Sequence, residues 1–81
     1  MSWYVYILRC GDDTLYTGVT DDVEKRLVAH RTGKGAKYTR GRGPLELAYV
    51  EERADKSAAL RREYEIKQMT RQKKLELLQK K

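Results

Sequence analysis

The chain has 81 residues, which limits it to one small domain with a single hydrophobic core. Its longest apolar run, residues 3–8, is far shorter than the roughly 20 residues of a membrane span, so we expect no membrane partner. One cysteine and one histidine exclude an internal disulfide and a zinc-finger site. Eighteen Lys and Arg against twelve Asp and Glu give a net charge of +6, which favours polyanionic partners.

The first two predicted elements form a hairpin. Residues 3–9 are aromatic, β-branched and aliphatic, a composition typical of a buried strand. Residues 10–13 have turn chemistry, and residues 14–19 have the composition of a second strand. Gly18 within that strand indicates a bulge or a close approach of another group to the backbone.

A helix is predicted after the hairpin. Thr20, Asp21 and Asp22 offer N-caps. Val23 and Leu27 are four residues apart and face the core, and Gly33 is a C-terminal stop. Residues 33–43 contain four glycines and read as a loop.

Residues 45–51 are predicted to form a third strand. Its inward face is expected to carry the alternate residues Leu45, Leu47 and Tyr49.

Two more helices are predicted in the C-terminal part. Asp55 can cap a helix over 56–69, and Thr70 can cap another over 71–80. One continuous helix over 56–80 is the alternative that the periodicity leaves open.

The element order β-β-α-β-α-α predicts an α/β sandwich with a small, mostly antiparallel sheet. The whole chain, 1–81, is expected to be one domain, with its core in about 3–70 and a basic C-terminal helix over 71–81. The lone Cys10 and an N-terminus without the pattern of a secretory signal favour a reduced, cytoplasmic setting.

A run of cations in the predicted loop is the first indication of function. Residues 31–45 contain five basic side chains and no acidic one. We expect Lys34, Lys37, Arg40 and Arg42 to contact a phosphate backbone and Tyr38 to stack on a base. The alternative, which we favour less, is that these charges only keep a surface loop solvated.

Five further polar residues can be brought together by the predicted fold. Tyr6 and Tyr16 lie on the two hairpin strands, where pairing places them in one region of the sheet. Arg26 and His30 are four residues apart and share one face of the first helix. Glu63 lies next to the apolar face of the second predicted helix.

Taken singly, each of these residues has an ordinary structural explanation. Strand tyrosines commonly fill a core, and Glu63 has an ion-pair partner in Lys67 four residues later. Their combination on a basic domain points to phosphodiester chemistry. That reaction needs an activated oxygen nucleophile, a cation near the non-bridging oxygens and stabilisation of the leaving oxygen.

The order of these residues resembles the GIY-YIG nuclease domain over about residues 3–70. The two triplets of that family correspond to residues 4–6 and 16–18, and they are degenerate at Tyr4, Val5 and Thr17. The triplets alone are a weak signal, but they are followed in the expected order by an arginine, a histidine and a glutamate. The chain is most similar to the short stand-alone bacterial branch, and it is also similar to the GIY-YIG domain of the excision-repair protein UvrC.

The resemblance implies a metal-dependent endonuclease that hydrolyses phosphodiester bonds, of DNA rather than RNA, with low sequence specificity. Glu63 would hold one Mg²⁺ or Mn²⁺ ion, because hard cations prefer carboxylate and water oxygens. Tyr6 would activate the attacking water, with Tyr16 and His30 assisting, and Arg26 would stabilise the developing negative charge. Which side chain takes the proton is left open.

If a tyrosine is the general base, activity depends on the fraction of its phenol that is ionised. A free phenol has a pKa of about 10, so about one in a thousand is ionised at pH 7. Unless Arg26 and the metal lower that value, we expect activity to climb with pH.

Two other functions remain compatible with the sequence. The first is a nucleic-acid-binding module on the same fold with little or no catalysis. The second is an interaction domain that recruits a partner through the basic helix over 71–81. We expect no second binding domain in so short a chain, so either a protein partner supplies specificity, or the protein forms a homodimer, or it is a weak nonspecific enzyme.

Overall fold

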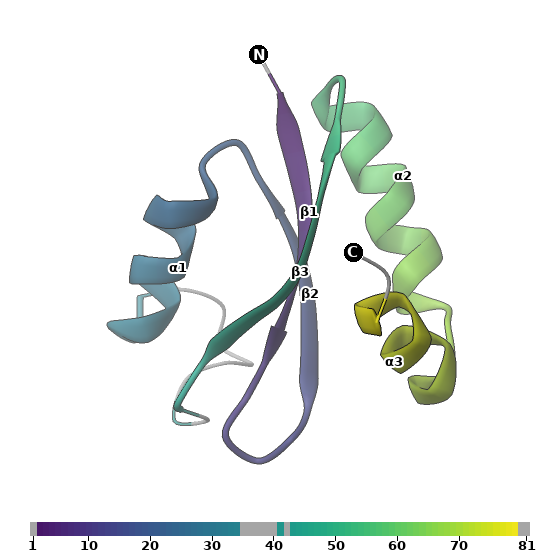
Figure 1. Cartoon of the computed structure of the whole chain (residues 1–81). Coiled ribbons are helices and arrows are strands. Elements are labelled where there is room, and N and C mark those ends of the chain that lie inside the picture. The colour runs from purple at the N-terminus through teal and green to yellow at the C-terminus, as the bar shows by residue number, and fades with distance from the viewer. Residues whose placement is uncertain (1, 35–40, 42, 80–81) are drawn as a thin grey trace.

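The computed structural model describes residues 2–34, 41 and 43–79. The predicted order β-β-α-β-α-α is confirmed, with bounds β1 (Trp3–Arg9), β2 (Leu15–Thr20), α1 (Val23–Arg31), β3 (Glu46–Arg53), α2 (Lys56–Lys67) and α3 (Arg71–Gln79). The sheet lies between α1 on one face and α2 with α3 on the other (Figure 1). The predicted α/β sandwich is therefore confirmed. No helix within the described ranges has the length and apolar character needed to cross a membrane.

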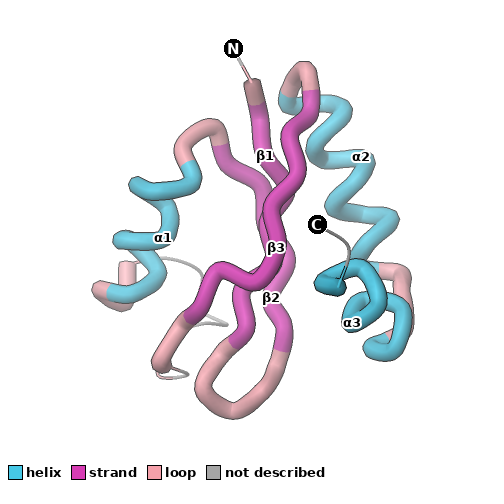
Figure 2. Tube along the Cα trace, viewed as in Figure 1, coloured by secondary structure: helices cyan, strands magenta, loops and turns pink. Residues whose placement is uncertain are grey.

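The sheet has the strand order β2-β1-β3, and both pairings are antiparallel. β1 is the central strand, with helices over both of its faces (Figure 2). Four consecutive residues of β1 are consequently buried, in contrast to the alternation of a one-sided sheet: Val5, Tyr6, Ile7 and Leu8.

The main apolar core fills the space between the sheet and the α2/α3 layer. It contains Val5 and Ile7 from β1 together with Ala59 and Ile66 from α2, all fully buried. Partly buried side chains of the strands and of α3 pack around this cluster. Because the core takes the odd-numbered residues of β1, the even-numbered Tyr6 points to the opposite face, under α1.

β3 contains a bulge that the sequence did not predict. Ile7 pairs with Tyr49 but Leu8 pairs with Leu47, so Ala48 is an extra residue in the β1–β3 ladder. Tyr49 packs against the main core, as expected. The simple alternation predicted for this strand is interrupted at Ala48.

Local hydrogen bonds fix both ends of α1. The Asp22 carboxylate accepts a hydrogen bond from the Lys25 backbone N–H, which caps the first turn. At the other end, Gly33 N–H donates to the His30 carbonyl and Lys34 N–H donates to the Ala29 carbonyl. This is a Schellman ending, and it requires the left-handed φ of +79° that Gly33 adopts. The predicted stop at Gly33 is confirmed.

The C-terminal part forms two helices, so the alternative of one continuous helix over 56–80 is wrong. Asp55 caps α2 by accepting from the Ala58 N–H at 2.8 Å. After α2 ends at Lys67, the Thr70 hydroxyl accepts from the Lys73 N–H at 3.2 Å and starts α3. The break allows the chain to reverse and α3 to pack against β3.

Candidate active site

Three rings meet on the face of the sheet that α1 covers. Tyr6 of β1 and Tyr16 of β2 have ring centroids 6.4 Å apart, and the His30 ring of α1 lies 5.8 Å from the first and 5.4 Å from the second. The Tyr6 Oη and His30 Nε2 atoms are 2.8 Å apart and share a hydrogen bond. Tyr6 and His30 are almost completely buried, whereas Tyr16 is half-buried.

Gly18 makes room for the Tyr6 ring. Tyr6 pairs with Gly18 across the β1–β2 ladder, so both face the same side of the sheet. A Cβ atom at position 18 would lie 2.5 Å from the Tyr6 Oη and 2.7 Å from its Cζ. The close approach indicated by a glycine inside a strand is therefore the approach of the phenol, and it lets Tyr6 reach across β2 toward His30.

Arg26 supplies a cation to both phenols. The pKa of its guanidinium is raised, first by a hydrogen-bonding interaction with Tyr6 and further by the charges of Tyr6 and Tyr16. Arg26 and His30 belong to successive turns of α1, and this spacing presents both side chains to the sheet. One cation next to two hydroxyl groups is an arrangement that can bind a phosphate.

The ionisation of Tyr6 and His30 is set by their environment. Burial raises the pKa of the Tyr6 phenol above 10.0, an effect that Arg26 opposes and the charges of Tyr16 and Glu63 reinforce. Burial and then the charge of Arg26 lower the pKa of His30 below 6.5. At neutral pH the pair is therefore a neutral phenol and a neutral imidazole.

Glu63 belongs to α2, in the layer on the face of the sheet opposite α1 (Figure 1). Its charge contributes to the raised pKa of Tyr6, which places it within electrostatic range of the phenol. Its side chain is 19% exposed, and its Oε2 atom lies 3.4 Å from the Lys67 Nζ. The ion pair expected between these two residues is thus confirmed, and it exists together with the proximity to Tyr6.

The donor set suits a weakly held hard cation rather than a closed metal centre. Among the described residues, no three His, Cys, Asp or Glu side chains gather closely enough to hold a metal ion. Glu63 is a partly accessible carboxylate. Mg²⁺ commonly uses one or two carboxylates and completes its shell with water and substrate phosphate. The residues present fit an ion of that kind.

The predicted cationic loop is described only at its two ends. Lys34 is exposed immediately after α1, whereas Lys37, Tyr38, Arg40 and Arg42 lie outside the described residues. A pocket of about 350 Å³ beside His30 is lined partly by these ends of the loop: Arg31, Gly33, Gly41, Gly43, Pro44 and Leu45. The sequence did not predict this pocket, because no pattern shows that Pro44 and Leu45 return to the end of α1.

The fold and this group of side chains define a GIY-YIG catalytic domain. The model of the family described as the GIY-YIG catalytic domain matches residues 2–76. The chain belongs to that family.

Within the family, the chain is similar to the UPF0213 proteins. It is 59% identical to one from Oceanobacillus iheyensis over 94% of this chain and 88% of the relative, and 57% identical to one from Clostridium perfringens over 93% and 81%. The solution NMR structure of a UPF0213 protein from Bacillus halodurans matches with a TM-score of 0.62 and 51% identity, over 96% of this chain and 83% of that one. A second NMR structure, from E. faecalis, matches with a TM-score of 0.64 and 38% identity, over 91% and 79%. The family and the fold expected from the residues are both confirmed.

Proposed function

We propose that the protein is a divalent-metal-dependent nuclease that hydrolyses phosphodiester bonds of DNA with low sequence specificity. The observation that carries this proposal is the meeting of two phenols and a neutral imidazole with an arginine that interacts with both phenols. A purely structural cluster under α1 would not need a guanidinium directed at two hydroxyl groups.

Arg26 has the role of binding the phosphate at the reaction centre. Its guanidinium always carries a charge and presents a fork of donors that matches phosphate oxygens. Interactions with Tyr6 and Tyr16 hold this fork in place before substrate arrives. A donor fixed in advance stabilises the extra negative charge of the transition state without a reorganisation cost.

Tyr6 has the role of general base, and His30 positions it. The raised pKa of Tyr6 means that little phenolate exists at pH 7. His30, neutral because its pKa is lowered, holds the Tyr6 hydroxyl in position through the 2.8 Å contact. Once ionised, the phenol oxygen is able to take a proton from the attacking water, and Tyr16 at its side contributes a second hydroxyl.

Glu63 has the role of holding one Mg²⁺ or Mn²⁺ ion. When bound, such an ion stabilises negative charge on the phosphate and on the leaving oxygen. Without the ion, the Glu63 carboxylate is paired with Lys67. A lone carboxylate binds such ions weakly, so we expect millimolar metal to be needed.

Binding is expected to depend on charge rather than on base sequence. The cationic stretch over 31–45 provides the phosphate contacts, and such contacts carry no direct information on base sequence. Affinity for nucleic acid should therefore fall steeply as salt is raised.

A second candidate function is a binding module with little catalysis. Two observations favour it: Tyr6 is harder to ionise than a free phenol, and Lys67 already neutralises the carboxylate that the metal needs. Binding without cleavage would then be the whole activity.

One experiment separates the two functions. Labelled single-stranded and duplex DNA are incubated with the protein in Mg²⁺, Mn²⁺ or EDTA, beside the variants Glu63→Gln and Glu65→Gln. Glu65 is the matched control, because it lies on the same helix but pairs with Arg62. Metal-dependent cleavage that is lost only in Glu63→Gln supports the nuclease. Binding without cleavage under all conditions supports the module and contradicts the nuclease.

A further inference from the structure

One flank of α2 exposes large apolar side chains that the core does not use. Tyr64 is 66% exposed and Leu60 is 42% exposed, and the two are four residues apart on the same side of the helix. Lys67, three residues after Tyr64, is 51% exposed. We call these three residues the α2 flank.

The α2 flank is next to Glu63 on the helix surface. Ala59 and Ile66 face the core, and Arg62 extends to one side, where its Nε donates to Glu51 of β3 at 2.8 Å. Glu63 follows Arg62 in sequence and is rotated by about 100° around the helix axis. It therefore lies on the other side of the core-facing residues Ala59 and Ile66, toward β2. Leu60 precedes it by three residues and Lys67 follows by four, so both adjoin its carboxylate.

We propose that the α2 flank binds the nucleotide next to the cleaved phosphodiester, with an unpaired base stacked on Tyr64. The inference rests on the proposed function, and it assigns that site a substrate with unpaired bases at the point of cleavage. Leu60 extends the apolar surface beside the ring, and Lys67 contacts the adjoining phosphate.

The chemistry of the flank favours this occupant. A tyrosine ring offers a rigid, flat surface, and every base has a π-face that can stack on it. In a duplex both faces of each base are already covered by neighbouring pairs, so the ring can be used only where bases are unpaired. Lys67, at the edge of the flank, complements a phosphate. The flank also adjoins Glu63, the carboxylate proposed to hold the metal ion next to the reacting phosphodiester.

A protein partner fits the flank less well. Exposed apolar surface often marks protein interfaces, but those cover several hundred Å². The α2 flank has only two apolar side chains, Leu60 and Tyr64, and they adjoin the ion pair between Lys67 and Glu63. We therefore treat a protein contact as an outcome that the experiment must detect.

The test measures the affinity of the full chain for a fluorescein-labelled single-stranded 20-mer and for the matching blunt duplex, by anisotropy at low salt in EDTA. Stacking on one base is worth about 1–3 kcal/mol, so Tyr64→Ala should weaken single-strand binding roughly 5- to 150-fold. Tyr64→Phe, which keeps the ring, should bind like the unaltered protein. Glu65→Ala, a truncation on the other flank of α2, is the control for a general effect on the helix.

Duplex binding decides whether the base contact is specific. If the ring serves unpaired bases, Tyr64→Ala should change duplex affinity by less than about two-fold. An equal loss on duplex and single strand, or unchanged single-strand binding, overturns the inference. A shift in sedimentation from dimer to monomer in Tyr64→Ala would also overturn it, because the flank would then be a protein interface.

The proposed function can fail separately. If the unaltered protein neither binds nor cleaves DNA, both proposals fail together. If it cleaves DNA in Mg²⁺ and Tyr64→Ala binds single strands unchanged, the nuclease stands and only the α2 flank is refuted. Circular dichroism of each variant confirms that a loss of binding is not a loss of fold.

Discussion

The Tyr6 phenol and the His30 imidazole share a 2.8 Å hydrogen bond across 24 positions of sequence. This bond joins the central strand to the only helix that the described residues place on that face. Burial acts on its two partners in opposite directions, raising the pKa of the phenol and lowering the pKa of the imidazole. Both groups are consequently held in their neutral forms, and this has consequences for activity and for stability.

The rate of DNA cleavage should rise with pH between 6 and 9. Because the pKa of Tyr6 is raised above 10.0, its ionised fraction is below about one in a thousand at pH 7 and grows about tenfold per pH unit. Single-turnover cleavage in saturating Mg²⁺ measures this dependence. Tyr6→Phe should cut the rate by roughly 10²- to 10⁴-fold while leaving DNA binding intact. A rate that is flat from pH 6 to 9 would count against a phenolate base.

Acid should destabilise the fold through His30. The pKa of His30 is lowered in the folded state, so the unfolded chain takes up the proton first, near pH 6.5. The His30 contribution to the free energy of unfolding is therefore constant above that pH and declines as pH falls from about 6.5 through the folded-state pKa. Urea unfolding at pH 7.5 and 5.5 measures the decline.

His30→Gln is the matched control, because its amide can still bond to Tyr6 but does not titrate. The window lies above the usual carboxylate range, so the Asp and Glu residues contribute little to the difference. If the variant loses as much stability between pH 7.5 and 5.5 as the unaltered protein, His30 is not the responsible group.

Gly18→Ala should displace Tyr6. The added Cβ would lie 2.5 Å from the phenol oxygen, and a ring packed under α1 cannot swing away as a flexible side chain could. We expect a loss of about 1–3 kcal/mol in the free energy of unfolding, typical of overpacking. A double-mutant cycle supplies the control: in a Tyr6→Val background, where the ring is gone, the same Gly18→Ala change should cost much less. An equal cost in both backgrounds would show that the strain arises elsewhere.

The sequence predicts the elements well, because each one is specified locally. The apolar run of β1, the caps Asp22 and Asp55 and the stop at Gly33 are all short-range signals, and the structure follows them to within about two residues. The choice between one C-terminal helix and two was not decided by periodicity. It depends on the capping hydroxyl of Thr70 and on the packing of α3 against β3, and the second of these is a long-range effect.

The meeting of the three rings was predictable from the sequence, but the pKa shifts of these groups were not. Pairing of the strands and the i, i+4 spacing on α1 were sufficient to bring Tyr6, Tyr16 and His30 together. The directions of the pKa shifts follow from the depth at which each group is buried, and sequence does not give that depth. The exposure of Tyr64 could not be predicted from the sequence either, because its four-residue spacing from Leu60 is equally typical of a core-facing stripe.

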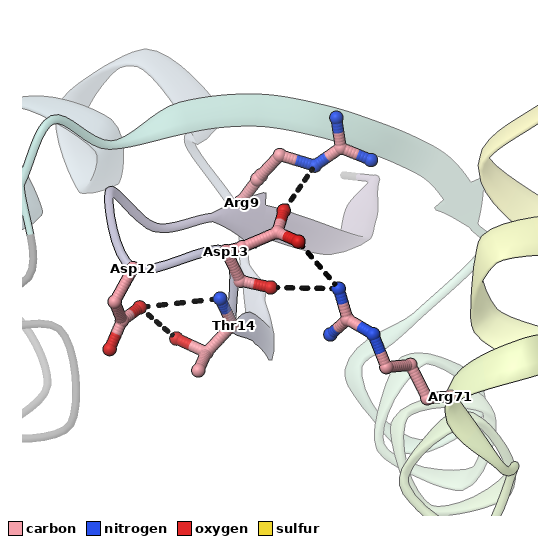
Figure 3. Close-up of polar contacts among 5 residues, drawn as sticks. All are labelled: Arg9, Asp12, Asp13, Thr14 and Arg71. Carbon is pink, nitrogen blue, oxygen red and sulfur yellow. Dashed lines mark hydrogen bonds and ion pairs between the residues drawn. The ribbon is translucent and has the colours of Figure 1, made fainter.

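Arg71→Ala should loosen α3 from the hairpin. One Arg71 Nη atom donates to the Asp13 carbonyl at 2.9 Å and to its carboxylate at 3.1 Å, and Arg9 approaches the same carboxylate at 3.8 Å (Figure 3). Asp13 is 74% exposed and Arg71 49%, so solvent screens the pair and the expected loss is about 0.5–1 kcal/mol. Thermal unfolding should show this as a decrease in Tm of roughly 2–8 °C.

Lys73→Ala is the control for that experiment, since it removes a cation from the same turn of α3 and changes helix propensity in the same direction. The two variants should also differ in their response to salt. If Arg71 acts through Asp13, the difference in Tm between Arg71→Ala and Lys73→Ala should shrink in 1 M NaCl, where the Debye length falls to about 3 Å. It should not vanish, because the hydrogen bond from Arg71 to the Asp13 carbonyl involves an uncharged acceptor. Equal Tm values for the two variants at low salt would mean that α3 is held by its apolar contacts alone.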